Sequence, residues 1–193
     1  CKLVEKLVGQ GEKVLVWTSF TMNIDFLLSE LAHLNPVYID GRVNAGDEDS
    51  DIGTRKNHIM RFKTDPNCKV FIANPAAASE GISLHLDNNR QKLCTHAIYM
   101  DRNYNCSQYL QSLDRIHRIG CVGTPNIFIM RTLNSIDMCV EKRLEEKINN
   151  LKKLLDDKSL HPTEIDADII FSDDNEALLS SDEINYYRQC LKM

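Results

Sequence analysis

Long apolar runs are absent from this chain of 193 residues. None approaches the roughly 18 consecutive apolar residues that a membrane-spanning helix needs, and no basic segment followed by an apolar one marks a secretion signal. The seven cysteines are an odd number and show neither a CxxC pair nor a paired Cys/His spacing, which argues against a disulfide framework and a zinc site. We therefore expect a soluble intracellular protein with no membrane partner and no metal site of its own, in which most cysteines are small core residues.

A phosphate-binding loop is also absent from the sequence. Such a loop has the pattern GxxxxGK[ST], in which backbone amides and a lysine surround the phosphates and a hydroxyl holds magnesium. The one glycine-rich candidate, residues 9–14, has neither this spacing nor the hydroxyl. No Asp-Glu pair follows a predicted strand as a magnesium-binding motif requires. The chain alone is therefore not expected to bind ATP tightly or to hydrolyse it.

An excess of charge of one sign occurs only near the C-terminal end. Residues 1–155 contain 20 Lys and Arg against 18 Asp and Glu, whereas residues 156–193 contain 3 against 10. The nearly balanced first part is compatible with a nucleic-acid-binding face but does not demand one. The acidic last part would repel phosphates, so we expect it not to bind nucleic acid.

The sequence does contain a regular alternation of strand and helix patterns. Short runs of β-branched and other apolar residues predict buried strands of a parallel sheet, and apolar residues at helical spacing predict helices between them. Hydrophobic residues make up 42% of the chain, enough to form a core. The alternation predicts an open α/β sheet with right-handed crossovers. The predicted strands are 14–17, 37–39, 70–73, 97–100 and 126–131, and the predicted helices are 3–8, 22–34, 55–63, 107–117 and 135–155.

The segment 111–120, QSLDRIHRIG, carries the most specific pattern in the chain. On a helix, at about 100° per residue, Gln111, Arg115 and Arg118 fall within about 60° of one another. The two guanidiniums would then point the same way, and their planar forks of donors suit the charge on a transferring phosphoryl group. Gly120 follows as a residue that readily adopts the left-handed conformation at a helix end. An RxxR spacing alone favours a solvated helix with an ion pair instead. The choice between this interpretation and a phosphate-binding arginine pair therefore depends on the flanking residues.

With those residues, the segment resembles motif VI of the superfamily-two helicase-like ATPases, and in particular of the Swi/Snf-type DNA translocases. That family writes the motif as Gln-x-x-Asp-Arg-x-His-Arg-x-Gly, and all six fixed residues are present here. Further segments match the family in chain order. They are KVLVWTSF at 13–20 as the first strand of the second lobe, Gly41, Arg55, Ile59 and Phe62 as a spaced block, AASEGISL at 77–84 as motif V, Asp101 with Asn105 before motif VI, and 132–155 as a helix that braces the two lobes.

The resemblance implies that the chain is the second, C-terminal lobe of a two-lobed ATPase whose first lobe carries the phosphate-binding loop. It implies a RecA-like open parallel sheet with helices on both faces over residues 1–134. A brace helix over 135–156 and an acidic C-terminal tail over 157–193 would follow. Apolar residues in the tail, among them Ile169 and Phe171, favour its packing against the protein over a fully solvated linker.

The resemblance also implies roles at the nucleotide. Arg118 is expected to be the main arginine finger, reaching the phosphates of ATP that the first lobe holds together with Mg²⁺. Arg115 would assist, and Gln111 would help to position the pair. Gly81 is expected where the backbone approaches the nucleotide or DNA closely. Glu80 is a candidate for the ribose, with a solvated loop residue as the alternative, because motif V here lacks the family's usual paired glycines.

Contacts with double-stranded DNA are expected from loop ends on one rim of the lobe, through phosphates rather than base edges. Thr18 and Ser19, at the end of the first strand, are candidate donors to phosphate, and so is Ser79 in motif V. Arg42 and Lys56 are basic candidates, with solvated surface charges as the alternative.

The function that the resemblance implies is the second motor lobe of an ATP-dependent double-stranded DNA translocase. The complete protein would hydrolyse ATP, and its partners would be DNA and the first RecA-like lobe of the same protein. A strand-separating helicase lobe and a non-catalytic RecA-like interaction module are the alternatives; the brace helix argues against the first and the arginine pair against the second. The expected location is the cytoplasm for a prokaryotic or viral protein and the nucleus for a eukaryotic one.

Overall fold

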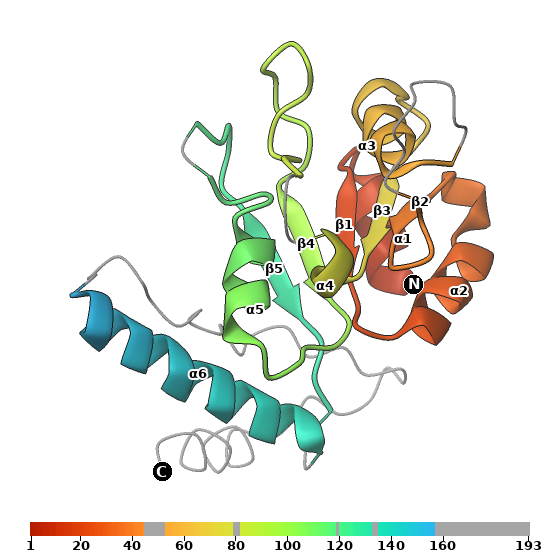
Figure 1. Ribbon diagram of the computed structural model, residues 1–193. Helices are drawn as coiled ribbons and strands as arrows, with labels where there is room; N and C mark the ends of the chain where they lie inside the picture. The colour runs from red at the N-terminus through yellow and green to blue at the C-terminus, as the bar shows by residue number, and fades with distance from the viewer. Residues whose placement is uncertain (45–52, 79–81, 119, 133–134, 157–193) are drawn as a thin grey trace. The chain divides into compact units, whose positions relative to one another are not determined.

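A five-stranded, all-parallel sheet forms the centre of the unit Cys1–Val140, with the strand order β2-β3-β1-β4-β5 (Figure 1). The computed structural model describes residues 1–44, 53–78, 82–118, 120–132 and 135–156. The sheet and its helices confirm the predicted α/β fold of the RecA-like type. The strands are β1 (Val14–Trp17), β2 (Val37–Ile39), β3 (Val70–Ala73), β4 (His96–Tyr99) and β5 (Asn126–Ile129).

The central strand β1 lies between β3 and β4. Its first residue, Val14, is in register with Val70 on one side and with His96 on the other. Every residue of β1 and β3 is buried, because a parallel sheet that is covered on both faces leaves no side of its inner strands to solvent. The structure confirms all the predicted strands, although β4 begins and ends one residue earlier and β5 ends two residues earlier than predicted.

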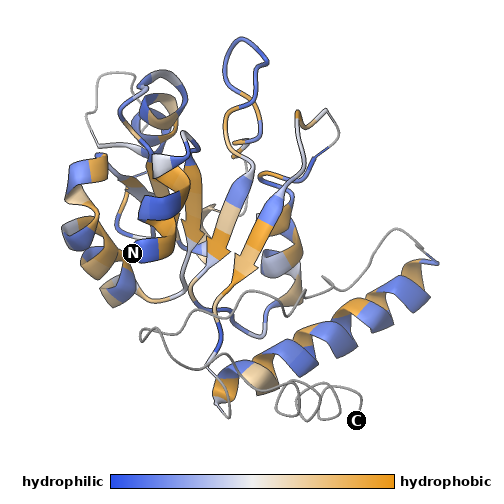
Figure 2. Ribbon diagram, turned by 180° about the vertical axis from the view of Figure 1, so that it is seen from behind, coloured by the Kyte–Doolittle hydropathy of each residue, from blue (hydrophilic) through white to orange (hydrophobic). Residues whose placement is uncertain are grey.

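Helices cover both faces of this sheet. Because successive strand residues point to opposite faces, each strand contributes to two separate layers of packing. On one face Val16 joins a core cluster with residues of α1 and α2. On the other face the Phe62 ring of α3 meets Phe71 edge-on at 5.2 Å between centroids, and the Tyr109 ring of α5 meets Tyr99 at 5.3 Å. Figure 2 shows that the strands are largely apolar, with polar residues where β4 and β5 begin, and that the helices carry both polar and apolar residues.

The helices largely follow the sequence pattern, with local capping at their beginnings. The Thr54 hydroxyl accepts a hydrogen bond from the Asn57 amide at 3.3 Å, and the Asn105 side chain accepts one from the Gln108 amide at 3.2 Å. The helix predicted at 22–34 divides into α2 and a short 3-10 helix, and α4 was not predicted. The helices are α1 (Lys2–Gly9), α2 (Thr21–Glu30), η1 (Ala32–Leu34), α3 (Arg55–Thr64), α4 (Pro75–Ala78), α5 (Cys106–Leu113) and α6 (Ile136–Leu155).

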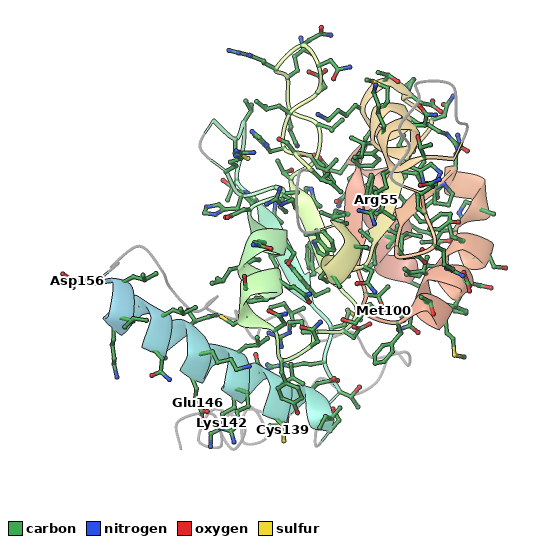
Figure 3. The ribbon with its side chains drawn as sticks, viewed as in Figure 1. Arg55, Met100, Cys139, Lys142, Glu146 and Asp156 are labelled. Atoms are coloured by element: carbon green, nitrogen blue, oxygen red, sulfur yellow. The ribbon has the colours of Figure 1, made fainter. Side chains whose placement is uncertain are left out.

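The last helix, α6, begins after Ser135, whose hydroxyl accepts a hydrogen bond from the Asp137 amide at 3.1 Å. Ser135 is therefore the N-cap that the sequence predicts. Of the predicted apolar stripe, Val140, Leu144 and Ile148 are buried, whereas Leu155 is 62% exposed. Figure 3 shows Lys142 and Glu146 on one side of this helix.

The chain divides into two compact units, Cys1–Val140 and Glu141–Met193. The predicted division into a lobe, a brace helix and a tail remains a prediction, and the tail lies outside the described residues. Within the ranges that the structure describes, no helix is long and apolar enough to cross a membrane.

Candidate functional site

The arginine motif leaves helical geometry earlier than predicted. Helix α5 ends at Leu113, and turns follow it. The Arg115 amide donates to the Ser112 carbonyl at 3.3 Å, and the Ile116 amide donates to the Leu113 carbonyl, also at 3.3 Å. These bonds to the third preceding residue tighten the backbone beyond an α-helix. The prediction of a helix through residue 117 is therefore wrong for its last turn, and Arg115 and Arg118 do not lie on one helix face.

Arg115 is half-buried, and its guanidinium holds two backbone carbonyls. Its Nε donates to the Gln111 carbonyl at 2.8 Å, and its Nη1 donates to the Ile82 carbonyl at 2.6 Å. In return the Leu84 amide donates to the Arg115 carbonyl at 3.1 Å. Gln111 is half-buried and contributes its carbonyl to this arrangement. Arg115 therefore connects the turn after α5 with residues 82–84, which belong to the segment that resembles motif V.

Arg118 lies further along the turn, and its side chain is exposed. No residue that the structure describes forms a hydrogen bond or ion pair with its guanidinium. His85, which is 7% exposed, is nearby: burial lowers the pKa of His85 below its ordinary value, and the positive charges of Arg118 and Lys63 lower it further. The positive charges of Arg118 and Lys63 therefore both act at His85. Gly120 has a φ of +89°, which confirms the predicted left-handed glycine after the arginines.

At the carboxyl ends of β1 and β4, one carboxylate joins the two strands. Asp101 accepts hydrogen bonds from the Thr18 hydroxyl, from the Ser19 amide at 2.7 Å and from the Asn23 side chain at 3.3 Å. Thr18 is completely buried, so the surrounding protein already engages its hydroxyl. Its predicted contact with a DNA phosphate remains a prediction, and that contact would require the hydroxyl to leave Asp101.

Ser19 differs from its neighbour in having an unused hydroxyl. Its amide donates to Asp101, and its carbonyl accepts a hydrogen bond from the Asn74 side chain at 3.0 Å. Its Oγ is enclosed and has no hydrogen-bond partner in the described part of the protein. An enclosed polar group without a partner costs about 1–3 kcal/mol, and native proteins keep few of them. Ser19 therefore remains a candidate for binding a ligand.

Asn74 and Arg55 hold α4, the short helix that leads into residues 79–81. The Asn74 Oδ1 accepts a hydrogen bond from the Ala76 amide at 2.8 Å, and Arg55 Nη1 donates to the Ala77 carbonyl at 3.0 Å. Arg55, labelled in Figure 3, belongs to the spaced block that resembles the family. The predicted site residues in 79–81 (Ser79, Glu80 and Gly81) lie outside the described residues.

Asn74 was not among the predicted site residues, although the sequence contains a signal for it. Asparagine is a favoured N-cap residue, and proline is favoured at the first position of a helix. The pair Asn74-Pro75 directly after a predicted strand therefore indicates a helix start, even though the four residues of α4 are too few to show a periodic pattern.

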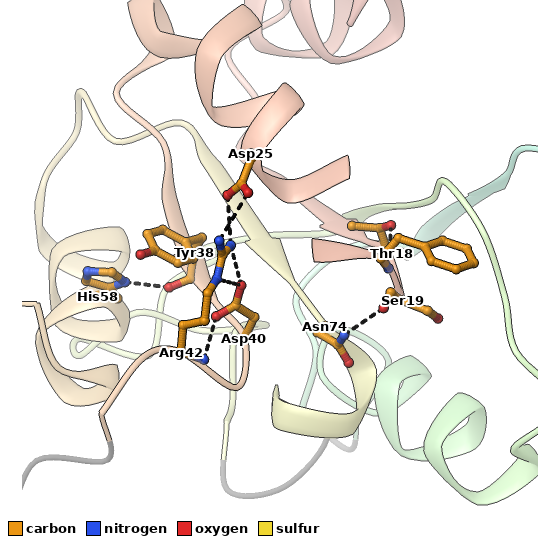
Figure 4. A network of polar contacts seen from close by, with 9 residues as sticks. Thr18, Ser19, Asp25, Tyr38, Asp40, Arg42, His58 and Asn74 are labelled. Carbon is orange, nitrogen blue, oxygen red and sulfur yellow. Dashed lines mark hydrogen bonds and ion pairs between the residues drawn. The ribbon is translucent and has the colours of Figure 1, made fainter. Parts of the chain in front are cut away.

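Arg42 lies in an ion-pair network (Figure 4). Its Nε donates to Asp40 at 2.8 Å, and its two Nη atoms donate to Asp25 at 3.1 and 2.8 Å. The hydrogen bond with Arg42 lowers the pKa of Asp25, and both carboxylates raise the pKa of Arg42. A phosphate would have to compete with them, so the predicted contact of Arg42 with DNA remains a prediction. Lys56, the other basic candidate, is exposed on α3.

Comparisons with known proteins agree with the fold and the motifs. Residues 1–120 match the helicase conserved C-terminal domain family. The human lymphoid-specific helicase is 27% identical over 156 residues, which are 80% of this chain and 17% of that protein. The ATP-dependent helicase FUN30 of Saccharomyces cerevisiae is 31% identical over 149 residues, which are 76% of this chain and 11% of that protein.

A solved structure is also similar. The crystal structure of the C-terminal part of the Fun30 ATPase domain shares 27% sequence identity with this chain, with a TM-score of 0.59 over 74% of this chain and 42% of that one. The chain thus spans less than a fifth of the length of the two relatives named above, at 17% and 11%. The matched domain, the parallel sheet and the ordered motifs agree, and the chain belongs to the helicase conserved C-terminal domain family, as the C-terminal RecA-like lobe of the Swi/Snf-type helicase-like proteins.

Proposed function

We propose that this chain is the second motor lobe of an ATP-dependent double-stranded DNA translocase and that it supplies Arg118 to ATP bound on a separate first lobe. The contrast between the two motif arginines carries this proposal. Arg115 is committed to two backbone carbonyls, whereas Arg118 is exposed and meets no partner among the described residues. Family membership supports ATP as the nucleotide, and so does the similarity to FUN30, an ATP-dependent helicase.

The roles of the two arginines follow from this contrast. When bound, ATP supplies a γ-phosphoryl group for transfer to water. The Arg118 guanidinium keeps its proton and would donate hydrogen bonds to the phosphate oxygens as their charge redistributes in the transition state. Arg115 would assist by holding the turn against residues 82–84, which limits the positions that Arg118 can take. Gln111 would help to position Arg115 by accepting a hydrogen bond from it through its backbone carbonyl. Gly81 and Glu80 remain proposed contacts for the nucleotide or its ribose.

The first lobe is proposed to supply the remaining parts of the catalytic site. Mg²⁺ at a nucleotide is usually held by one or two carboxylates together with substrate phosphates and water, and the sequence has no Asp-Glu pair after a strand that would supply them. The proposed Mg²⁺ ligands and the phosphate-binding loop therefore belong to the other lobe. The relatives named above come from human and yeast. This supports the nucleus, expected for a eukaryotic protein, over the cytoplasm, expected for a prokaryotic or viral one.

The proposed DNA contacts lie at loop ends near the carboxyl edge of the sheet. Ser19 is the best-supported donor there, since its enclosed hydroxyl is unpaired in the described structure. Ser79 and Lys56 remain proposed phosphate contacts. Thr18 and Arg42 are weaker candidates, because both already engage carboxylates.

The test is to measure ATP turnover by the complete protein and by this chain alone, each with and without linear double-stranded DNA. We expect DNA to stimulate the complete protein and the chain alone to show no turnover, because its sequence lacks the phosphate-binding loop. Displacement of a third strand from a DNA triplex, with the duplex left intact, would distinguish translocation from strand separation. Turnover by the chain alone, or a complete protein that ignores double-stranded DNA, would refute the proposal.

A further inference from the structure

Asn74 joins two parts of the carboxyl edge through the two ends of one side-chain amide. Its Nδ2 donates to the Ser19 carbonyl at 3.0 Å (Figure 4). Its Oδ1 accepts from the Ala76 amide of α4 at 2.8 Å. These partners are 55 and 2 residues away from Asn74 in the sequence. A side chain of this length that uses both its donor and its acceptor has little freedom to rotate, so the loop after β1 and the start of α4 hold a fixed spacing.

The main chain of Ser19 is fixed on both sides by this arrangement. Its amide donates to Asp101 at 2.7 Å, and its carbonyl is held by Asn74. Only the hydroxyl of Ser19 is left unpaired in the described structure. The fixed backbone and the unused side-chain donor together form a preorganised loop whose position depends on Asn74 and Asp101.

Helix α4 continues this connection toward the arginine turn. It lies against α5, the helix that precedes the arginines. Further along the chain, the Ile82 carbonyl receives the Nη1 hydrogen bond of Arg115 at 2.6 Å. A displacement of α4 would therefore be transmitted to α5, the helix that precedes the arginine turn.

We propose that Asn74 is a positioning residue that couples the Ser19 loop to α4, so that DNA bound at this loop stimulates ATP turnover. The inference rests on the proposed function, because it assigns a task at the same carboxyl edge. The part of Asn74 that matters for coupling is its Nδ2 donor, whereas its Oδ1 acceptor serves the helix cap.

Substitutions in the complete protein can separate the role of the Asn74 Nδ2 donor from that of its Oδ1 acceptor. Asn74→Ser keeps a neutral cap residue of similar strength but loses the donor to Ser19. Asn74→Ala loses both the cap and the donor. Asn74→Asp keeps the cap oxygen and places an acceptor opposite the Ser19 carbonyl. Asn89→Ser, at an exposed position in a different loop, is the matched control.

The measurement is the concentration of double-stranded DNA that gives half-maximal stimulation of ATP turnover, together with the thermal midpoint of each variant. We expect Asn74→Ser, Asn74→Asp and Asn74→Ala all to raise that concentration about tenfold, which corresponds to about 1.4 kcal/mol, the scale of one hydrogen bond. All three variants lose the hydrogen bond to Ser19 and should lower the thermal midpoint, and Asn74→Ala, which also loses the cap, should lower it most. Asn89→Ser should match the wild type in both respects.

A purely structural role of Asn74 predicts a different pattern. Asn74→Ser would then respond to DNA as the wild type does, and any effect of Asn74→Ala would follow its thermal midpoint; this outcome overturns the inference and leaves the proposed function intact. If the wild-type protein shows no stimulation by double-stranded DNA, the proposed function fails and the inference fails with it.

Discussion

Replacing Arg115 by alanine should destabilise the protein, whereas the same change at Arg118 should not. Arg115→Ala removes two hydrogen bonds from a charged donor, to the carbonyls of Ile82 and Gln111. Each such bond contributes about 1.5–3 kcal/mol, and the half-exposed position of the guanidinium reduces the total because water screens part of the interaction. Ile82 is buried, so water cannot readily replace the lost donor. We expect Arg115→Ala to lower the free energy of unfolding by about 2–3 kcal/mol.

Urea titration of the 193-residue chain measures this difference. Trp17 is the single tryptophan and is buried in β1, so its fluorescence reports directly on unfolding of the sheet. Arg118→Ala should stay within about 0.5 kcal/mol of the wild type, as is usual for surface changes that remove no buried contact. The free energy of unfolding of Arg115→Lys should lie between those of the wild type and Arg115→Ala, because a lysine has no rigid fork that can donate to two carbonyls at once. An Arg115→Ala chain as stable as the wild type, with the same urea dependence, would refute the bracing role of Arg115.

Two further predictions concern stability. Because the folded-state pKa of His85 lies below its ordinary value, owing to burial and then to Arg118, the unfolded chain binds protons more readily below about pH 6.5. The free energy of unfolding should therefore decrease as the pH falls through this range, and the decrease should be smaller in His85→Gln. Urea titrations at pH 7.5 and 5.5 measure it. The same decrease in the wild type and in His85→Gln would contradict this prediction. Lys13→Met should lower the free energy of unfolding by about 1–2 kcal/mol in the same assay, because Lys13 donates hydrogen bonds to the carbonyls of Phe62 and Asp65 at the end of α3. Partial burial of the ammonium group, which lowers the pKa of Lys13, offsets part of the stabilisation that these bonds give. A Met variant of wild-type stability would show that these carbonyls find water instead.

The strands were the part of the fold that sequence reasoning predicted best. Buried parallel strands are apolar throughout, so runs such as Val14–Trp17 and Val70–Ala73 are visible without knowledge of their neighbours. The end of α5 was predicted less well, because helical spacing says nothing about contacts from elsewhere. The bonds that join Arg115 to residues 82–84 come from a distant part of the chain, and the turn that they hold departs from the helix.

The side-chain partners at the site were beyond the reach of sequence patterns. Arg42 is basic in the sequence, but it contacts Asp25, 17 residues earlier, only because α2 and the loop after β2 meet in the fold. In the same way, Thr18 and Asp101 are 83 residues apart and meet because β1 and β4 are adjacent strands. A motif can therefore identify Arg118 as a candidate, but only the fold shows which neighbouring donors are already engaged.

The most direct test of the central claim is ATP turnover by the complete protein carrying Arg118→Ala, at saturating double-stranded DNA. Arg143→Ala, which removes an exposed arginine paired with Glu146 on α6, is the matched control. We predict that Arg118→Ala lowers turnover by about 10³-fold or more with unchanged stability, that Arg118→Lys restores little of it, and that the control stays near the wild type. Turnover by a folded Arg118→Ala protein within a few-fold of the wild type would contradict the claim that this lobe supplies Arg118 to ATP.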